Sequence, residues 1–536
     1  MGLGEKIRKL RITAKLTQME FAEMCGVTTQ AIQKWENGSY SPSLEKLVLL
    51  SKHFHVSLDE LVMNSNQRAM EEQQHISLAP SFALASEGEF YSEQLLIEYI
   101  QSVQEGKNIS SYHALFDAIQ HMPRNEYKER MAKTLFELII NAPDIEDYPY
   151  VEPSDYEGIC HEWAETKKYQ KTIEAKQLKG KIAGAWYGRI CGCLLGKPVE
   201  GIHTSELLPI LQASGNYPMH RYIQKTDLTE EMIRNTKFSL EGRCFADTVT
   251  CMPTDDDTNY VVLNQELIEK YGFDFTPANV SKIWLDSQSK NAYWTAERAA
   301  YCNFVNGYLP PVSAVYKNPY REWIGAQIRA DYFGYIHPGM PEAAAQMAWR
   351  DASISHVKNG IYGEMWIAAL LAIAAIDTTV SHALYESLNY IPQKSRLAEH
   401  LQYVIRDYEE KLPAEKCFQN IHARWDEENP HDFCHTISNA EIVAASLLYG
   451  HENFGKSICL AVQTGFDTDC NGATVGSIVG MCHGLEAIDS SWLEPLHGKL
   501  DTSIFGVGMV QIDDRIALTM KHIDALNVKA NKKQEH

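Results

Sequence analysis

Helical periodicity over most of the chain is the feature that most restricts its fold. Between residues 174 and 527, apolar residues recur at three- and four-residue spacing, for example over 365–375, 440–449 and 476–487. Strand-like alternation is scarce, and no repeat of roughly 20–50 residues is recognisable. We therefore expect an all-α domain over 174–527, with its chemistry on the loops between helices.

A second, smaller domain is predicted at the N-terminus. Residues 3–63 read as five short helices, with Thr17 and Thr28 as candidate N-caps and Gly26 as a helix end. The second and third helices, joined by a short turn, have the shape of a helix-turn-helix. The predicted organisation is a helix-turn-helix domain at 1–66, a linker at 67–91, a helical connector at 92–173 and the large domain at 174–527.

The connector has no motif of its own. Residues 92–141 regain helical periodicity after the linker, with Pro123 and Pro143 interrupting it. This stretch fits either a packing accessory to the large domain or a surface for a partner.

Charge and cysteine content narrow the classes of function. The net charge is −21, whereas residues 1–66 hold eight Lys/Arg and seven Asp/Glu, so an acidic body follows a near-neutral head. We find no apolar run as long as a membrane span and no signal-peptide core at the start, so we expect a cytoplasmic protein that does not bind membranes. The 12 cysteines lack a framework spacing, which is typical of small buried side chains in a reducing compartment.

Two acidic segments each precede a strongly helical run. The first carries Asp255, Asp256 and Asp257, and the second carries Asp467 and Asp469. Carboxylates this close repel one another unless a cation neutralises them, and oxygen-rich sets suit Mg²⁺ or Mn²⁺. One such segment alone would be explained by helix capping. Both together predict a shared site, which could hold two ions about 4 Å apart.

The helix predicted after the second acidic segment is rich in glycine, with Gly472, Gly476, Gly480 and Gly484. Glycine is costly inside a helix. This spacing therefore predicts a close approach by another backbone or by a ligand.

Four landmarks, in one order over roughly residues 180–520, resemble the ADP-ribosylglycohydrolase family, which includes the enzyme that reactivates ADP-ribosylated dinitrogenase reductase. They are Gly-Cys-Leu-Leu-Gly-Lys-Pro-Val-Glu over 192–200, Asp-Asp-Asp-Thr over 255–258, Asp-Ala-Ser-Ile-Ser-His over 351–356, and Gly-Phe-Asp-Thr-Asp-Cys over 465–470. The resemblance implies an all-α fold, a site for two Mg²⁺ or Mn²⁺ ions, and hydrolysis of the bond between ribose C1″ and the modified group.

The resemblance also implies roles for individual residues. The implied metal ligands are Asp255, Asp256, Asp257, Asp467, Asp469 and Cys470. The implied catalytic residues are Glu200, Asp256, Asp257 and Asp469, with Glu200 positioning the ribose or assisting proton transfer. The implied substrate-binding residues are Gly325, Arg329, Asp351, His356 and Asn471. Within this set Arg329 would pair with the diphosphate, and His356 either contacts the ligand or is a buried structural histidine.

Three positions depart from the family pattern. Asp255 and Cys470 stand where the family usually has hydroxyl residues, and Cys193 replaces the usual Asp. Asp255 adds a charge that we expect to tighten or reposition a cation, whereas Cys470 offers a softer ligand that suits Mg²⁺ poorly. These departures leave the identity and number of the ions open, and they indicate a divergent branch whose substrate need not be a protein side chain.

The N-terminal domain resembles the phage-repressor class of helix-turn-helix. The resemblance places Thr29, Gln30, Gln33 and Lys34 in the major groove and Gln18 and Lys15 on phosphates. Because the segment is barely basic, we expect weak binding by a monomer and a homodimer on a paired double-stranded DNA operator. Use of this domain for protein contact alone is the alternative.

Three functions are compatible with the sequence. The first is a metal-dependent hydrolase of an ADP-ribosylated protein, nucleic acid or small molecule, coupled to a DNA-binding domain. The second is a transcriptional regulator whose hydrolase-like domain senses ADP-ribose or a related nucleotide. The third is hydrolysis of a different N-glycoside. The retained carboxylates favour the enzyme, because a sensor has no need of a complete metal set.

Overall fold

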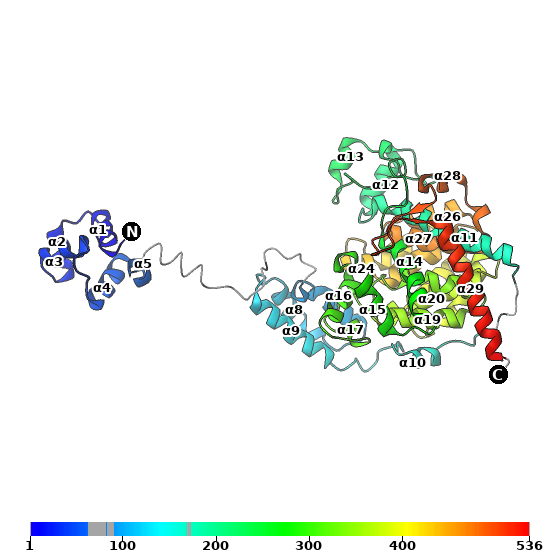
Figure 1. Cartoon of the computed structure of the whole chain (residues 1–536), viewed down its shortest axis with the longest axis horizontal. Coiled ribbons are helices and arrows are strands. Elements are labelled where there is room, and N and C mark those ends of the chain that lie inside the picture. Colours follow the sequence, from blue (N-terminus) through cyan, green and yellow to red (C-terminus); the bar gives the residue numbers. More distant parts are fainter. Residues whose placement is uncertain (1, 63–81, 83–89, 168, 170–172, 535–536) are drawn as a thin grey trace. The chain divides into compact units, whose positions relative to one another are not determined.

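The computed structural model is built almost entirely of helices (Figure 1), which confirms the expected all-α fold. It describes residues 2–62, 82, 90–167, 169 and 173–534, so most of the predicted linker lies outside the described residues. The strands among them are β1 (Lys499–Leu500) and β2 (Val510–Gln511), which pair antiparallel. The chain divides into two compact units, Met1–Ala85 and Ser86–His536.

Five helices form the described part of the first unit, as predicted: α1 (Leu3–Thr13), α2 (Gln18–Cys25), α3 (Thr29–Glu36), α4 (Leu44–Phe54) and α5 (Leu58–Val62). The Thr17 hydroxyl caps α2 by accepting from the backbone N–H of Glu20, and the Glu20 carboxylate accepts from the Thr17 N–H in return. Helix α2 ends at Gly26, which adopts a φ of 63°, and Thr28 caps α3. Local capping chemistry therefore fixes the helix-turn-helix.

The first unit has its own apolar core, formed by Ile7, Phe21, Ile32, Trp35 and Leu50. A polar clasp closes it: Glu36 at the end of α3 accepts from Arg11 at 2.5 Å and from Gln18 at 2.8 Å. These bonds join α1, α2 and α3.

In its described residues, the second unit begins with four α-helices: α7 (Leu95–Gln104), α8 (His113–Gln120), α9 (Glu126–Ile140) and α10 (Tyr156–His161). Buried ion pairs join this segment to the body of the unit. The Arg321 guanidinium pairs with Glu98 at 2.8 Å and Glu105 at 2.6 Å, and Arg396 pairs with Glu152 at 2.8 Å. These contacts favour the packing role for the connector.

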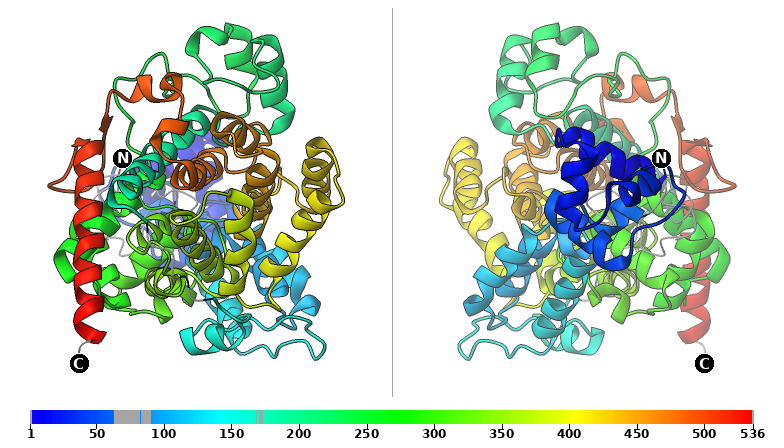
Figure 2. Two further views of the ribbon diagram at one scale, coloured as in Figure 1. Left: turned by 90° about the vertical axis from the view of Figure 1, so that its right-hand side faces the viewer. Right: turned by 90° about the vertical axis from the view of Figure 1, so that its left-hand side faces the viewer.

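The body of the second unit contains a long series of helices (Figure 2). They are α11 (Ala175–Gly196), α12 (Thr204–Ala213), α13 (Glu230–Asn235), α14 (Asp256–Tyr271), α15 (Pro277–Ser287), α16 (Thr295–Val305), α17 (Val312–Val315), α18 (Asp331–Tyr335), α19 (Pro341–Ala352), α20 (Lys358–Ala374), α21 (Val380–Ser387), α22 (Arg396–Glu409), α23 (Ala414–Arg424), α24 (Pro430–Cys434), α25 (Thr436–Tyr449), α26 (Phe454–Gln463), α27 (Thr468–His483), α28 (Ser490–Leu493) and α29 (Ile512–Gln534). Helix α29, red in Figure 2, runs along one side of the unit. None of the helices in the described residues is both long and apolar enough to cross a membrane.

Helices α11 and α27 cross in direct backbone contact at the centre of the unit. Gly184 faces Gly480, Gly188 faces Gly476 and Gly192 faces Gly472, so the helices run antiparallel with one contact per turn. A Cβ at any of these glycines would overlap the carbonyl oxygen of the facing one. The glycine-rich sequence of α27 is thus explained by the close approach of another backbone, and the crossing brings the C-terminal end of α11 to the N-terminal end of α27.

Candidate metal centre

Each acidic segment lies at a helix N-terminus. Asp255 is the N-cap of α14, and its Oδ1 accepts from the backbone N–H of Asp257 at 2.9 Å. Asp467 is the N-cap of α27 but makes no side-chain capping bond. Helix dipoles favour negative charge at both places. Helix capping therefore explains the position of Asp255 but not those of the remaining carboxylates.

The fold brings the two acidic segments together. Asp257, Asp469 and Cys470 each offer one ligand atom, and these atoms lie within 4.8 Å of one another. Cys193, Asp255 and Asp257 form a second group by the same measure. All five residues are buried. The two groups share Asp257, so the end of α11 and both acidic loops meet at this residue.

Several buried acceptors at this place have no hydrogen-bond partner. They are Asp257 Oδ2, Asp469 Oδ1 and Asn471 Oδ1. A buried, unpaired carboxylate oxygen is costly. Carboxylate and amide oxygens are also the atoms that a hard divalent cation binds. The residues present therefore fit a metal ion.

Burial and mutual repulsion shift the acidity of the cluster. Burial, with repulsion from Asp255 and Asp469, raises the pKa of Asp256 to about 8. Burial also raises the pKa of Asp257, Asp467 and Asp469 above its ordinary value. Without a cation, the cluster would take up protons at neutral pH.

Lys197 lies within the cluster and was missed by the sequence analysis. It belongs to the short 3₁₀ helix η4 (Lys197–Val199), and its Nζ lies 2.5 Å from Asp255 Oδ2. The extra charge of Asp255 is therefore balanced by this ammonium, whereas we expected it to act on a cation. The available signal was the position of Lys197 in the 192–200 segment that contains Glu200.

Glu200 follows η4 and is exposed. Repulsion from the Asp469 carboxylate is the largest cause that raises the pKa of Glu200 well above its ordinary value. A protonated carboxyl beside several carboxylates can donate a proton.

Asn439 of α25 fixes the second acidic loop. Its Oδ1 accepts from Asn471 Nδ2 at 2.8 Å and from the backbone N–H of Asp467 at 3.3 Å. Asn439 is fully buried and was not singled out from the sequence. It holds the loop to α25 and leaves Asn471 Oδ1 available to the site.

The other expected substrate residues lie together in a buried ion-pair cluster. The Arg329 guanidinium is fully buried and donates to Asp351 at 2.5 Å, Glu297 at 2.6 Å and Ser355 at 3.1 Å. His356 Nδ1 lies 2.9 Å from the same Ser355 hydroxyl, and Gly325 lies against the Glu297 carboxylate. Pairing of Arg329 with a diphosphate would require these ion pairs to break, so its environment fits a structural role.

The helix-turn-helix presents a polar face on α3. Gln30, Gln33 and Lys34 are exposed and Thr29 is half-buried. Gln18, expected on phosphate, is half-buried and donates to Glu36.

Comparison with known proteins identifies the families of both domains. The sequence model of the ADP-ribosylglycohydrolases matches residues 174–522, and a helix-turn-helix model matches residues 7–61. The chain belongs to the ADP-ribosylglycohydrolase family. A solved structure described as an ADP-ribosylglycohydrolase-related protein complex overlaps 65% of this chain and 99% of its own length, with 20% identity and a TM-score of 0.39.

The N-terminal domain of this ADP-ribosylglycohydrolase has relatives of a different kind. It is 44% identical over 62 residues to the HTH-type transcriptional activator BcrR of Enterococcus faecalis, and 37% identical over 60 residues to the antitoxin PezA of Streptococcus pneumoniae. These matches cover 12% and 11% of this chain but 30% and 38% of the relatives. A Bacillus subtilis protein described as the uncharacterized HTH-type transcriptional regulator YqaE is 33% identical over 95 residues, which are 17% of this chain and 82% of that relative.

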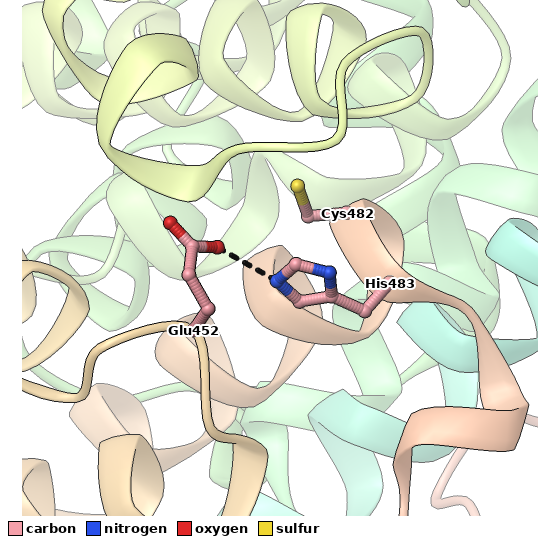
Figure 3. A group of neighbouring side chains, drawn as sticks. All are labelled: Glu452, Cys482 and His483. Atoms are coloured by element: carbon pink, nitrogen blue, oxygen red, sulfur yellow. Dashed lines mark hydrogen bonds and ion pairs between the residues drawn. The ribbon is translucent and has the colours of Figure 1, made fainter.

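A third group of potential ligands lies at the opposite end of α27 (Figure 3). Glu452 accepts from His483 Nε2 at 2.7 Å and from the backbone N–H of Val380 at 3.0 Å, while the Cys482 thiol faces the Asp377 carbonyl. Glu452 thus pairs with His483 and satisfies a donor at the start of α21. These bonds account for the group without a metal ion.

Proposed function

We propose that the chain hydrolyses the C1″ glycosidic bond of an ADP-ribosylated target in a metal-dependent reaction. We further propose that its helix-turn-helix binds a double-stranded DNA operator. The observation that carries the hydrolase proposal is the meeting of Asp257 with Asp469 and Cys470, which come from segments far apart in the chain. Membership of the ADP-ribosylglycohydrolase family supports the reaction class.

The candidate ligands of the cation are Asp256, Asp257, Asp467, Asp469 and Cys470, and family precedent points to Mg²⁺ or Mn²⁺. When bound, the cation polarises ribose hydroxyls and lowers the pKa of water. The unpartnered oxygens of Asp257 and Asp469 support this assignment, because each is buried and lacks a hydrogen bond.

Side chains of the site would supply proton donation, charge stabilisation and ribose binding. Repulsion from Asp469 and burial raise the pKa of Glu200, which favours a carboxyl that can donate a proton to the group that leaves C1″. The carboxylates of Asp257 and Asp469 stabilise the positive charge that develops at the anomeric carbon. Asn471 Oδ1, which is buried and has no hydrogen-bond partner among the described residues, would accept from a ribose hydroxyl.

The buried cluster of Arg329, Asp351, His356 and Gly325 would support the site indirectly. Glu297, which pairs with Arg329, acts electrostatically on Asp256. We propose that this buried cluster positions the first acidic loop, while contacts with the diphosphate come from elsewhere.

The N-terminal domain would act on DNA as a homodimer in the cytoplasm. The exposed Gln30, Gln33 and Lys34 support base contacts. The transcriptional regulators among its relatives support DNA binding by residues 7–61.

ADP-ribose release tests the hydrolase proposal. The full-length chain is incubated with Mn²⁺ or Mg²⁺ and with ADP-ribosylated protein, DNA or small molecules. We expect release from one substrate class and a loss of at least about a thousandfold in the Asp469→Asn variant, because a ligand to the catalytic ion is removed. The exposed Asp286→Asn variant, which alters a carboxylate of α15 paired with Lys270, is the matched control and retains full activity.

Two results would contradict the hydrolase. No release from any substrate, combined with a change in operator affinity on adding ADP-ribose, would establish the nucleotide-sensing regulator instead. Release of a base from an unmodified nucleoside, without any ADP-ribose, would establish a different N-glycosidase.

A further inference from the structure

Lys197 pairs with Asp255 on one side of the acidic cluster. Its Nζ lies 2.5 Å from Asp255 Oδ2, and the two side chains are 20% and 2% exposed. The other oxygen of Asp255 accepts from the Asp257 N–H. Both oxygens of Asp255 are therefore engaged by donors of the protein itself, in a position where the family usually has a hydroxyl residue.

The Lys197 ammonium also acts on the carboxylates around it. It has favourable charge interactions with Asp255 and Asp469, with Asp256 and with Glu200. An ammonium is a compact point charge that can neutralise carboxylates, although it offers no empty coordination position. It meets the electrostatic need for a cation on this side of the cluster.

On the other side of the cluster, formed by Asp257, Asp469 and Cys470, some buried ligand atoms have no hydrogen-bond partner in the described part of the chain. Asp257 Oδ1 accepts from Arg189 at 3.0 Å, but its Oδ2 has no partner, and neither has Asp469 Oδ1. Cys470 and these two aspartates offer ligand atoms within 4.8 Å of one another, and Asn471 adds a further unpartnered buried oxygen. This side of the cluster therefore offers enough ligand atoms for one ion.

We propose that the site holds one divalent cation, at Asp257, Asp469 and Cys470, and that the ammonium of Lys197 takes the place of a second cation beside Asp255. This inference rests on the proposed function, since it assumes that the cluster binds metal. It implies that Lys197 and Asp255 act as a pair: the carboxylate provides the counter-charge that holds the ammonium in the cluster.

The set of donors also narrows the class of ion. Two carboxylates and a thiol form a mixed oxygen and sulfur site, which Mn²⁺, Co²⁺ or Zn²⁺ accepts more readily than Mg²⁺. Among these ions, family precedent points to Mn²⁺, so Mn²⁺ is the probe for counting ions.

The test is a count of bound ions. The full-length chain is stripped with a chelator, dialysed to equilibrium against Mn²⁺, and its metal content is measured by mass spectrometry. We expect one Mn²⁺ per chain in the natural sequence and in Lys197→Arg, which keeps the charge. We expect two in Lys197→Ala and in the double variant Lys197→Ala, Asp255→Thr, which restores the family's usual hydroxyl.

Three outcomes are decisive. Two Mn²⁺ ions in the natural chain, or one in both Lys197→Ala variants, would overturn the inference. No bound Mn²⁺ in a folded chain would overturn the metal-dependent hydrolase as well. One ion in the natural chain and two in the variants, without ADP-ribose release, would leave the inference standing and overturn only the hydrolase.

Discussion

At the residue scale, the site is defined by charges that are balanced within the protein. Lys197 balances Asp255, Arg189 balances Asp257, and Arg329 balances Asp351 and Glu297. Lys197 also has a favourable charge interaction with Asp469, but among the described residues Asp469 Oδ1 has no hydrogen-bond partner. Burial and the neighbouring Asp255 carboxylate raise the pKa of Asp469, and a bound cation would favour its ionised form. We therefore expect a bound cation to matter most at Asp469.

The raised pKa of Asp256 predicts a stability that depends on pH. Asp256 keeps its proton to about pH 8 in the folded chain, whereas the ordinary pKa is 3.8. Between these values the folded state binds more protons than the unfolded state, so the free energy of unfolding falls as pH rises. We expect the Tm of the metal-free chain to decrease from pH 5 to pH 8, with a smaller decrease in Asp256→Asn.

Thermal melts with a chelator present measure this dependence, with Asp286→Asn as the control that keeps the full decrease. Saturating Mn²⁺ should flatten it, because a cation displaces the proton from the carboxylates. A Tm that is constant or rises over this range would contradict the argument.

At the scale of elements, the α11–α27 crossing places the site. Backbone contact through glycines lets the two helices lie closer than side chains would allow. The turn after α11 carries Lys197 and Glu200, and the N-terminus of α27 carries Asp469 and Cys470. The geometry of the crossing therefore sets the distance between the Lys197 ammonium and the proposed metal ligands.

Two glycines of α11 provide a matched pair. A Cβ at Gly192 would overlap the carbonyl oxygen of Gly472, whereas a Cβ at Gly180 meets nothing within 4 Å. We expect Gly192→Ala to destabilise the chain by about 3 kcal/mol or more, because backbone must move. Gly180→Ala should stabilise it by roughly 0.5–1 kcal/mol, because glycine is the poorer helix former. Chemical denaturation measures both, and equal effects would disprove the role of the crossing.

At the scale of the whole molecule, the connector and the catalytic body share their interior. Ile97 of α7 packs on a small core of Ala296, Tyr320 and Trp323. Gln101 of α7 donates to the buried Glu322 at 2.6 Å. The second unit accordingly begins at Ser86, well before the family match at residue 174.

Truncation tests this shared interior. A chain that starts at residue 174 loses Glu98, Glu105 and Glu152 and leaves Arg321 and Arg396 without these partners. Breaking a buried pair costs about 3–5 kcal/mol, so we expect this chain to aggregate or to melt well below the full-length protein. A chain that starts at Ser86 should melt at the same temperature as the second unit does in the full-length protein. Equal Tm values for the two truncated chains would contradict the argument.

The sequence by itself determined the helices of the first unit, the all-α body and the two acidic loops. These features depend on residues a few positions apart: the Thr17 and Glu20 capping box, the φ of Gly26, and helical periodicity. The glycines of α27 also predicted a close contact, although the sequence did not identify the element that α27 contacts.

Only the tertiary structure decided which charges meet. Lys197 lies 58 positions from Asp255, and Arg329 lies 22 positions from Asp351. Ion pairs between such positions depend on how helices cross, which local propensity does not encode. For that reason the sequence interpretation treated Asp255 as added charge and Arg329 as a diphosphate ligand, whereas the fold pairs each of them inside the protein.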